Sequence, residues 1–218
     1  MKKELINLWK NSFVIKAITA LDNKKFRKKL KNHNFTIICS NCIGGVIYNR
    51  LGERFNSPTL NIAIVQKEFC DFINYFDYYL SIEMTDGGLR NDGVPLGILK
   101  GDESLIPDIT VELVHYRSFE EGKNKWDERK KRVNKDNLYI IMFDTEGVTY
   151  EDLKKVENFK CNNKVILTSN PDCNISWSHY IEENKNTQYP KFFMDRDIWG
   201  RRNFEKNFDF VEFINKIK

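Results

Sequence analysis

The sequence predicts a three-layer α/β/α fold with a mixed, mainly parallel central sheet and an N-terminal amphipathic helix. Two observations lead to this prediction. Hydrophobic runs typical of buried strands alternate along the chain with segments of helical periodicity. The composition, with 41% hydrophobic and 30% charged residues, is ordinary for a folded globular protein. A length of 218 residues favours one compact domain over a tandem array.

A basic arm, residues 1–31, precedes the predicted α/β domain, residues 32–218. The arm contains ten Lys or Arg residues but only two acidic residues. Such a helix either packs on the domain or rests on an anionic membrane surface, where Trp9 and Phe13 would enter the interface. Its apolar residues recur at spacings of three and four, as in an amphipathic helix: Leu5, Leu8, Trp9, Phe13, Ala17, Ala20 and Leu21.

The domain is predicted to begin with one strand and two helices. Residues 35–39 form an apolar run typical of a buried strand. Residues 43–51 predict a short helix, because Gly52 provides a stop signal directly after them. Residues 66–80 predict a second helix, because their apolar side chains share one helical face: Phe69, Ile73, Phe76 and Leu80.

The middle of the chain is rich in strand signals. Residues 82–84, 96–99 and 109–114 are strand candidates. Two turn signals, Asp86-Gly87-Gly88 and Asn91-Asp92-Gly93, indicate a surface loop between them. This stretch breaks the alternation of strand and helix, so we expect it to add antiparallel pairs to the sheet.

The second half returns to alternation. Residues 119–135 predict a heavily charged helix, and residues 138–143 (LYIIMF) a strongly hydrophobic strand. A helix at 150–159, a strand at 164–168 and a closing amphipathic helix at 204–217 follow. Because helices separate the most hydrophobic strands, those strands should lie parallel, with both faces of the sheet covered.

The cysteines, the charge and the hydropathy limit where the protein acts. The chain has no convincing secretory signal and a net charge of +4, so we expect free thiols in the cytoplasm and no nucleic-acid partner. The apolar stretch at residues 12–21 is interrupted by Lys16 and is shorter than the roughly 20 residues of a spanning helix. No transmembrane segment is therefore predicted. The cysteines are odd in number: Cys39, Cys42, Cys70, Cys161 and Cys173.

The exit from the first strand is the most informative local feature. Ser40, Asn41, Cys42, Gly44 and Gly45 lie where a buried strand passes through a turn into a helix. Such a turn directs backbone N–H groups at one point and can bind an anion. It lacks the glycine fingerprint of dinucleotide sites and the P-loop lysine. The alternative is that the two glycines only allow close packing of helix on sheet.

Cys39 and Cys42 form a C-x-x-C motif at the same junction. Thioredoxin-like proteins carry their redox pair at such a position. A zinc site would require a second pair, which the sequence lacks, so no metal site is predicted. The default interpretation is that Cys39 is buried in the strand, since free cysteine is usually interior.

His115 and Tyr116 follow a predicted strand, at the end where open α/β sheets place ligands. An imidazole there can act as a general base or as a phosphate contact. The alternative is a structural histidine, because Ser118 can cap the helix that follows.

Three residues of the charged helix share about a third of its circumference: Trp126, Arg129 and Arg132. An indole beside two guanidinium groups can stack on a ring and hold a phosphate. The alternative is an ordinary solvated helix. Asp195 and Asp197 form a D-x-D pattern, expected about once by chance, and Asp144 ends a strong strand; both are secondary candidates.

Taken together, these motifs resemble a bacterial family of unknown function, number 1919, over roughly residues 30–215. Its members are often described as exopolysaccharide or capsular polysaccharide biosynthesis proteins. The resemblance implies a three-layer α/β fold, a cytoplasmic location and a role in building surface glycan. Val94-Pro95 stands where the third motif carries an aromatic residue before proline. The matching motifs, in order, are Ser40–Gly45, Ser57-Pro58-Thr59, Pro95-Leu96-Gly97, His115-Tyr116 and Trp126-x-x-Arg129-x-x-Arg132.

Three hypotheses follow. The first is a transferase at the cytoplasmic face of the membrane, moving a sugar or another group from a phosphate-activated donor to a saccharide; no particular cofactor is indicated. His115 would take a proton, and Arg129 and Arg132 would neutralise the leaving group. Further substrate contacts would come from the other motif residues: Ser40, Asn41, Gly44, Gly45, Ser57, Thr59, Tyr116 and Trp126.

The second hypothesis is a hydrolase or an acyl or phosphoester transferase, with Cys42 or Ser40 as nucleophile and His115 as base. The third is a noncatalytic adaptor of a glycan-assembly complex, docked by the basic arm. An enzyme requires a polar cleft, and an adaptor an exposed apolar patch.

Overall fold

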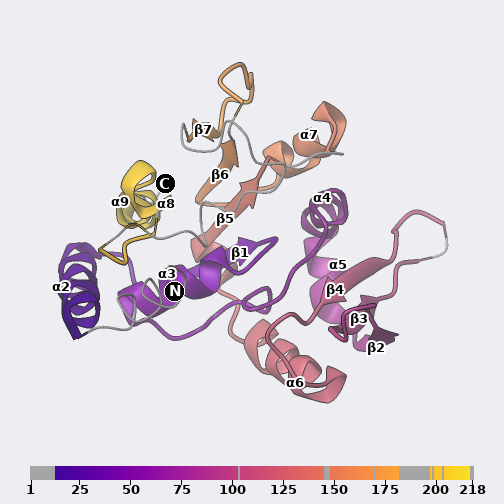
Figure 1. The fold of residues 1–218 in the computed structure, drawn as a ribbon. Coiled ribbons are helices and arrows are strands. Elements are labelled where there is room, and N and C mark those ends of the chain that lie inside the picture. The colour runs from indigo at the N-terminus through magenta and orange to yellow at the C-terminus, as the bar shows by residue number, and fades with distance from the viewer. Residues whose placement is uncertain are drawn as a thin grey trace.

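The computed structural model describes residues 13–102, 104–144, 148–168, 170–181, 197, 199–202 and 204–216. Its central sheet contains four parallel strands in the order β1-β5-β6-β7 (Figure 1). Helices connect β1, β5 and β6, as the alternation predicts. The strands are β1 (Thr36–Cys39), β5 (Leu138–Phe143), β6 (Asn163–Thr168) and β7 (Ser178–Tyr180).

Side chains alternate between the two faces of this sheet and divide the core into two clusters. Ile37 and Cys39 of β1 face one cluster with Tyr139 and Ile141 of β5. Ile38 faces the other, together with every second residue of β5. Strands β1 and β5 are therefore buried on both faces, which explains why their residues are almost all apolar. Thr36 of β1 is polar, and its buried hydroxyl donates to the Asn56 carbonyl at 3.3 Å.

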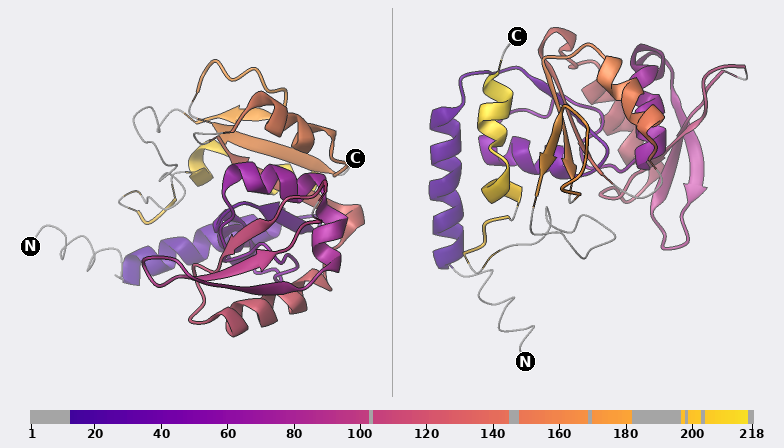
Figure 2. Two further views of the ribbon diagram at one scale, coloured as in Figure 1. Left: turned by 90° about the vertical axis from the view of Figure 1, so that its right-hand side faces the viewer. Right: turned by 90° about the horizontal axis from the view of Figure 1, so that it is seen from above.

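Helices cover both faces, so the predicted α/β/α architecture is confirmed (Figure 2). One face carries α3 (Ile43–Leu51), α8 (Phe204–Asn207) and α9 (Phe210–Asn215). The other carries α4 (Gln66–Asn74), α5 (Phe76–Ser81) and α7 (Tyr150–Asn158).

The antiparallel strands form a second sheet instead of extending the first. Its order is β2-β3-β4, with β2 (Met84–Leu89), β3 (Pro95–Leu99) and β4 (Ile109–Glu112). Helix α6 (Phe119–Lys130) packs on this sheet, and a 3₁₀ turn (Lys135–Asn137) leads into β5.

Several element boundaries differ from the predictions for local reasons. The helix predicted at 204–217 is two helices, because the Asp209 side chain caps α9 by accepting the N–H groups of Val211 and Glu212. The helix predicted at 66–80 breaks at Tyr75, which ends α4 and begins α5. Asp86-Gly87-Gly88 lies within β2, where the pairing with β3 is irregular, and is not a loop.

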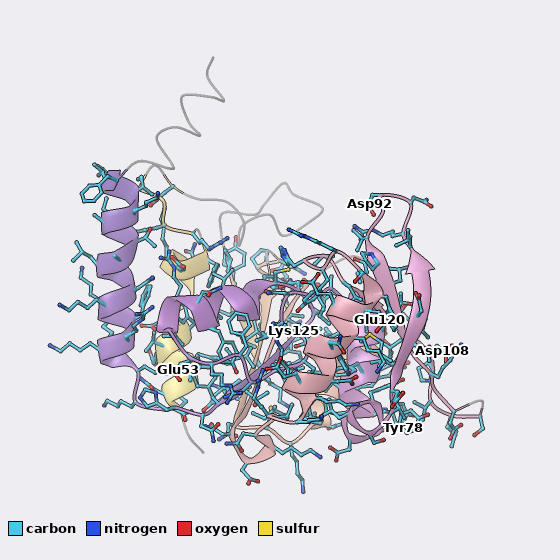
Figure 3. The ribbon with its side chains drawn as sticks, turned by 90° about the horizontal axis from the view of Figure 1, so that it is seen from below. Glu53, Tyr78, Asp92, Asp108, Glu120 and Lys125 are labelled. Atoms are coloured by element: carbon cyan, nitrogen blue, oxygen red, sulfur yellow. The ribbon has the colours of Figure 1, made fainter. Side chains whose placement is uncertain are left out.

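Helix α2 (Phe13–Lys29) lies on the outside of the domain, against α3. Its inner side is buried at Ile15, and its Phe26 ring lies 4.9 Å from that of Phe210. Asp22 pairs with Arg201 at 2.7 Å. The other side projects away from the protein (Figure 3).

The first part of the predicted arm, with Leu5, Leu8 and Trp9, lies outside the described residues. Among the helices that the structure describes, none has the length and apolar character to cross a membrane.

Candidate functional site

Two side chains of complementary chemistry meet at the exits of two strands. Cys42 follows β1 and occupies the N-cap position of α3. His115 follows β4, in a tight turn closed by a 3.0 Å hydrogen bond from the Tyr116 N–H to the Leu113 carbonyl. The Cys42 Sγ and His115 Nε2 atoms lie 3.1 Å apart, although 73 positions separate the residues in sequence. We call this pair the Cys42–His115 dyad.

The segment at residues 56–64 explains why the two exits meet. On one side, the Ile64 N–H donates to the Ser40 carbonyl at the end of β1, at 2.9 Å. On the other side, Ala63 forms an antiparallel bridge with Glu112 at the end of β4, with N···O distances of 2.9 and 2.8 Å. The segment thus joins the two sheets and holds the ends of β1 and β4 next to each other.

The surroundings of Cys42 keep its thiol protonated at neutral pH. Burial raises the pKa of the Cys42 thiol to about 11, and the positive charge of Arg202 offsets part of that rise. The N-terminus of α3 provides a partial positive charge that favours a thiolate once it forms. A neutral thiol becomes a strong nucleophile only when a base accepts its proton. The exposed imidazole of His115 lies within hydrogen-bond distance to do so.

Cys39 occupies a different environment. Its side chain is fully buried, its S–H donates to the Asn41 carbonyl at 3.0 Å, and the Gly44 N–H donates to its sulfur. Burial raises its pKa to about 12. The interior position expected for Cys39 is therefore confirmed. Cys39 and Cys42 are both free thiols, and their different partners give no support to a redox pair.

Two further residues of the turn have partners that hold the turn in place. Ser40 is 1% exposed, and its Oγ accepts a 2.6 Å hydrogen bond from Gln66 Nε2. The Asn41 side chain accepts the Ile43 N–H at 3.1 Å. The amides that would form a phosphate cradle are thus partly used within the turn. Of the two predicted nucleophiles, only Cys42 lies partly exposed.

Gly44 and Gly45 are positions of close packing. A Cβ on Gly44 would lie 2.7 Å from both Cys39 Sγ and Leu60 Cδ2, and one on Gly45 would lie 2.5 Å from Asn61 Oδ1. The neighbours of Gly44 are buried core atoms that cannot move aside, whereas the neighbour of Gly45 is the end of one polar side chain. The structure therefore supports the packing interpretation most strongly for Gly44.

Ser57 and Thr59 lie in the interior and join the 56–64 segment to β1. Both are fully buried, and their hydroxyl oxygens lie 3.1 Å apart. Thr59 Oγ1 accepts the Cys39 N–H at 3.1 Å. The Ser57 Oγ in turn accepts the Thr59 N–H at 3.2 Å. Both hydroxyl groups thus satisfy backbone donors, so a substrate contact would require the segment to move.

Tyr116 and Arg129 support the turn that carries His115. Arg129 is 8% exposed, and its Nη1 donates to the Tyr116 hydroxyl at 2.7 Å and to the Leu60 carbonyl at 2.8 Å. Its guanidinium group lies 5.1 Å from the centre of the Phe55 ring. In the described part of the chain, no carboxylate pairs with Arg129. Burial raises the pKa of Tyr116, and the Arg129 charge opposes that rise.

The predicted grouping of Trp126, Arg129 and Arg132 around one ligand requires correction. Trp126 is 1% exposed and packs at 6.1 Å from Phe72 in the core, so its ring has no free face for stacking. Arg132 pairs with Glu128 on the surface of α6 at 2.6 Å. The helix predicted over 119–135 ends at Lys130, so Arg132 lies in the turn after α6 and not on its face. Packing on the second sheet buries Trp126.

The secondary acidic candidates are placed as follows. Asp144 directly follows β5 and accepts a 2.7 Å hydrogen bond from Thr168 Oγ1, at the carboxyl edge of the parallel sheet. Asp195 of the D-x-D pattern lies outside the described residues, while Asp197 accepts two backbone N–H groups at 2.9 Å. Among the residues that the structure describes, no group of three or more His, Cys, Asp or Glu is able to hold a metal ion.

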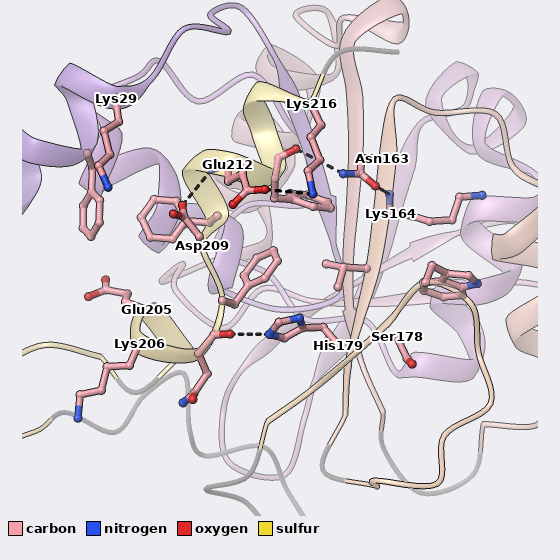
Figure 4. Close-up of a pocket in the computed structure, with 17 residues that line it drawn as sticks. Lys29, Asn163, Lys164, Ser178, His179, Glu205, Lys206, Asp209, Glu212 and Lys216 are labelled. Carbon is pink, nitrogen blue, oxygen red and sulfur yellow. Dashed lines mark hydrogen bonds and ion pairs between the residues drawn. The ribbon is translucent and has the colours of Figure 1, made fainter.

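A cavity of about 740 Å³ lies elsewhere, between α9 and strands β6 and β7 (Figure 4). Lys164 donates to three backbone carbonyls at the end of α7. Lys216 pairs with Glu212 at 3.3 Å, and His179 Nε2 contacts the Asn207 carbonyl. These lining groups stabilise neighbouring elements. The Cys42–His115 dyad is not among the residues lining this cavity, so the chemistry of the dyad is separate from it.

Sequence reasoning missed two residues near the dyad. Arg202 lies shortly before α8, far from Cys42 in sequence, and no motif indicates that its charge acts on Cys42. Gln66 begins α4 and bonds Ser40, while its amide oxygen is buried without a hydrogen-bond partner among the described residues. Both contacts depend on tertiary packing that no local pattern encodes.

Comparison with known proteins yields a family and a relative. A family model described as "Domain of unknown function (DUF1919)" matches residues 13–215. An "Uncharacterized protein" of Haemophilus influenzae (strain ATCC 51907 / DSM 11121 / KW20 / Rd) is 29% identical over 193 residues, which cover 88% of this chain and 90% of the relative. Neither description names an activity.

Proposed function

Because the chain belongs to the DUF1919 family, whose description names no activity, we propose a function from the site itself. The protein is a thiol-dependent acyl transferase or hydrolase, with Cys42 as nucleophile and His115 as general base. The observation that carries this proposal is the 3.1 Å distance between Cys42 Sγ and His115 Nε2. A nucleophile within hydrogen-bond distance of a base is the geometry that covalent catalysis requires.

The reaction has two steps. Cys42 Sγ attacks the carbonyl carbon of an ester or thioester while its proton moves to His115 Nε2. The tetrahedral intermediate then collapses to a thioester on Cys42, and the leaving group takes the proton from His115. In the second step, water or an acceptor hydroxyl attacks the thioester, its proton moves to His115, and the Cys42 sulfur leaves and regains that proton. The positive charge of Arg202 near Cys42 favours the negative charge that develops in both steps.

The electrostatics favour acyl transfer over phosphoryl transfer. A pKa of about 11 makes Cys42 a neutral thiol that needs a neighbouring base, and His115 is placed to be one. A phosphate group would need free N–H donors in the turn. The N–H groups of Ile43 and Gly44 already donate to Asn41 Oδ1 and Cys39 Sγ. We therefore prefer a carbonyl substrate.

A role in surface polysaccharide biosynthesis at the cytoplasmic face remains a prediction from the resemblance. The transferase hypothesis assigns Arg129 and Arg132 to the binding of a phosphate-activated donor. In the structure, Arg129 donates to Tyr116 and to the Leu60 carbonyl, and Arg132 pairs with Glu128. A saccharide hydroxyl as the acceptor of an acyl group is the part of that prediction that our proposal keeps.

The test is acylation with p-nitrophenyl acetate, an ester whose coloured product reports the first step. We expect a burst of p-nitrophenolate and an acetyl group on Cys42, located by peptide mass spectrometry. His115→Gln removes the base and should slow acetylation of Cys42 by about 10²- to 10⁴-fold.

His33→Gln is the matched control. His33 is exposed and bonds Glu53 at 2.7 Å, and its replacement should leave the acetylation rate unchanged. Acetylation spread equally over Cys42, Cys161 and Cys173, or a rate on Cys42 that does not depend on His115, would contradict the proposal.

A further inference from the structure

Helix α2 has two sides of opposite character. At 100° per residue, the buried Ile15 and Asp22 and the half-buried Phe26 fall on one side, packed against the domain. The other side, which we name the outer face, projects into solvent (Figure 3). Its members are exposed or half-buried: Phe13, Val14, Lys16, Ala17, Ala20, Leu21, Lys24, Lys25 and Lys28.

The outer face is apolar at its N-terminal end. Phe13 is 85% exposed, Leu21 60% and Val14 47%, so three large apolar side chains lie in water on one helix. Single exposed apolar residues are ordinary, but a cluster on one face of a helix marks an interaction surface.

The outer face carries only positive charge. Lys16 lies among the apolar residues, and Lys24, Lys25 and Lys28 follow in the last turns. The one acidic residue of α2, Asp22, lies on the inner side and is paired with Arg201 at 2.7 Å. No carboxylate of the helix therefore offsets the lysines on the outer face.

We infer that the outer face of α2 is a docking surface for an anionic lipid bilayer. Lysines attract anionic headgroups, and Phe13, Val14 and Leu21 enter the interface beside them. A second copy of this face is disfavoured, because the same positive charges would oppose each other. A nucleic acid is disfavoured too, since a phosphate backbone gives no reason to expose apolar side chains.

The test is flotation of the full chain with vesicles of phosphatidylcholine alone or of equal parts phosphatidylcholine and phosphatidylglycerol. We expect binding to the anionic vesicles only, weakening as salt is added. Lys24→Glu with Lys25→Glu should lower the partition coefficient by at least about 25-fold, roughly fivefold for each lysine lost. Phe13→Ser with Leu21→Ser keeps the charge and should lower it by about tenfold.

The matched control is Lys67→Glu with Lys131→Glu, which changes the net charge equally at exposed positions outside α2. This variant should keep binding within a few-fold of the original protein. All four outer-face substitutions are at exposed positions, and thermal unfolding checks that the variants fold. Three results would overturn the inference: equal binding to both vesicle types, an outer-face variant that binds like the original, or an equal loss in the control. Sedimentation showing a dimer lost in the outer-face variants, without vesicle binding, would assign the face to a second copy.

Discussion

The inner and outer sides of the turn after β1 place two cysteines in opposite situations. On the inner side, Cys39 is fully buried, and its sulfur contacts backbone groups of the turn. On the outer side, Cys42 is partly exposed and lies 3.1 Å from His115 Nε2. The two residues are only three positions apart. What separates them is the direction of the chain, which leaves the strand at Ser40 and enters α3 at Ile43.

The two environments of Cys39 and Cys42 result from the turn after β1, which positions the site. Cys39 and the glycines fix α3 against β1, and that position places Cys42 at the helix N-cap, opposite the His115 turn. The inner side of the turn, with Cys39, fixes the position of α3. The outer side carries Cys42, the proposed nucleophile. The two sides should therefore respond differently to substitution: the first in stability, the second in reactivity.

The largest effect on stability is expected from overfilling the inner side. Gly44→Val places carbon atoms where the Cβ alone would lie 2.7 Å from Cys39 Sγ and Leu60 Cδ2. We expect the free energy of unfolding to fall by about 3 kcal/mol. For a chain of this size that lowers Tm by about 6 to 12 °C, which differential scanning calorimetry measures.

Gly45→Ala is the control for that experiment. Its Cβ would meet only the end of the Asn61 side chain, which can rotate away. The gain in helix propensity, about 1 kcal/mol, offsets the contact. If Gly45→Ala lowered the free energy of unfolding as much as Gly44→Val, both glycine positions of α3 would be intolerant of an added atom. The effect of Gly44→Val could then not be assigned to the contacts with Cys39 and Leu60.

The elements that followed from the sequence are those whose local pattern and tertiary packing agree. Strand β5 was predicted at residues 138–143 with its observed limits, because a strand buried on both faces is apolar throughout. Helix α3 is predicted at 43–51 because Gly52 is a stop signal, and in the structure Gly52 adopts the left-handed conformation, with φ of 72°, that ends a helix. Strand β7 (Ser178–Tyr180) was missed, since three residues at a sheet edge carry little pattern.

The site was predictable only in part. A sequence shows which residue types can do chemistry, so Cys42 and His115 are predictable as a candidate nucleophile and base, and the fold places them 3.1 Å apart. It does not show which polar residues the fold uses for itself. Trp126 and Arg132 have the spacing of one helical face, yet Trp126 is in the core, and Arg132 lies beyond the end of α6 in an ion pair with Glu128. Whether such a side chain is buried or exposed depends on which sheet its helix packs against.

A smaller effect, a loss of about 1.4 kcal/mol at pH 10, is expected from the ionisation of the buried Cys39 thiol. The ordinary pKa of a cysteine thiol is 9.0, and burial raises that of Cys39 to about 12. Between these values the unfolded chain releases the proton while the folded chain keeps it. The contribution of Cys39 is therefore complete below pH 9 and is lost as the pH rises toward 12, by up to about 1.4 kcal/mol per pH unit.

Urea unfolding at pH 8, 9, 10 and 11 measures this loss. Cys39→Ala should flatten the decline above pH 9. Cys42→Ala should remove a contribution that ends earlier, because burial raises the pKa of Cys42 only to about 11. An unchanged slope in Cys39→Ala would mean that the buried thiol is not the group that resists ionisation.

The smallest effect on stability is expected from the hydrogen bond between Tyr116, beside His115, and the buried Arg129. Tyr116→Phe removes the hydroxyl that accepts from Arg129 Nη1 at 2.7 Å, but Arg129 keeps its 2.8 Å bond to the Leu60 carbonyl. We expect the free energy of unfolding to fall by about 1 kcal/mol. Tyr78→Phe is the control, because its exposed hydroxyl donates at 3.1 Å to the Lys100 carbonyl, directly after β3, and no other partner of this hydroxyl is found among the described residues (Figure 3).

Acetylation of Cys42 by p-nitrophenyl acetate shows whether the Tyr116 hydroxyl only stabilises the fold or takes part in the reaction. The backbone turn between Leu113 and Tyr116 positions His115 without the hydroxyl, so the rate in Tyr116→Phe should stay within a few-fold of the original. A loss as large as that of His115→Gln would place the Tyr116 hydroxyl in the reaction itself. The site would then be a triad that extends through Arg129 into the interior, and the separation of a structural inner side from a chemical outer side would fail.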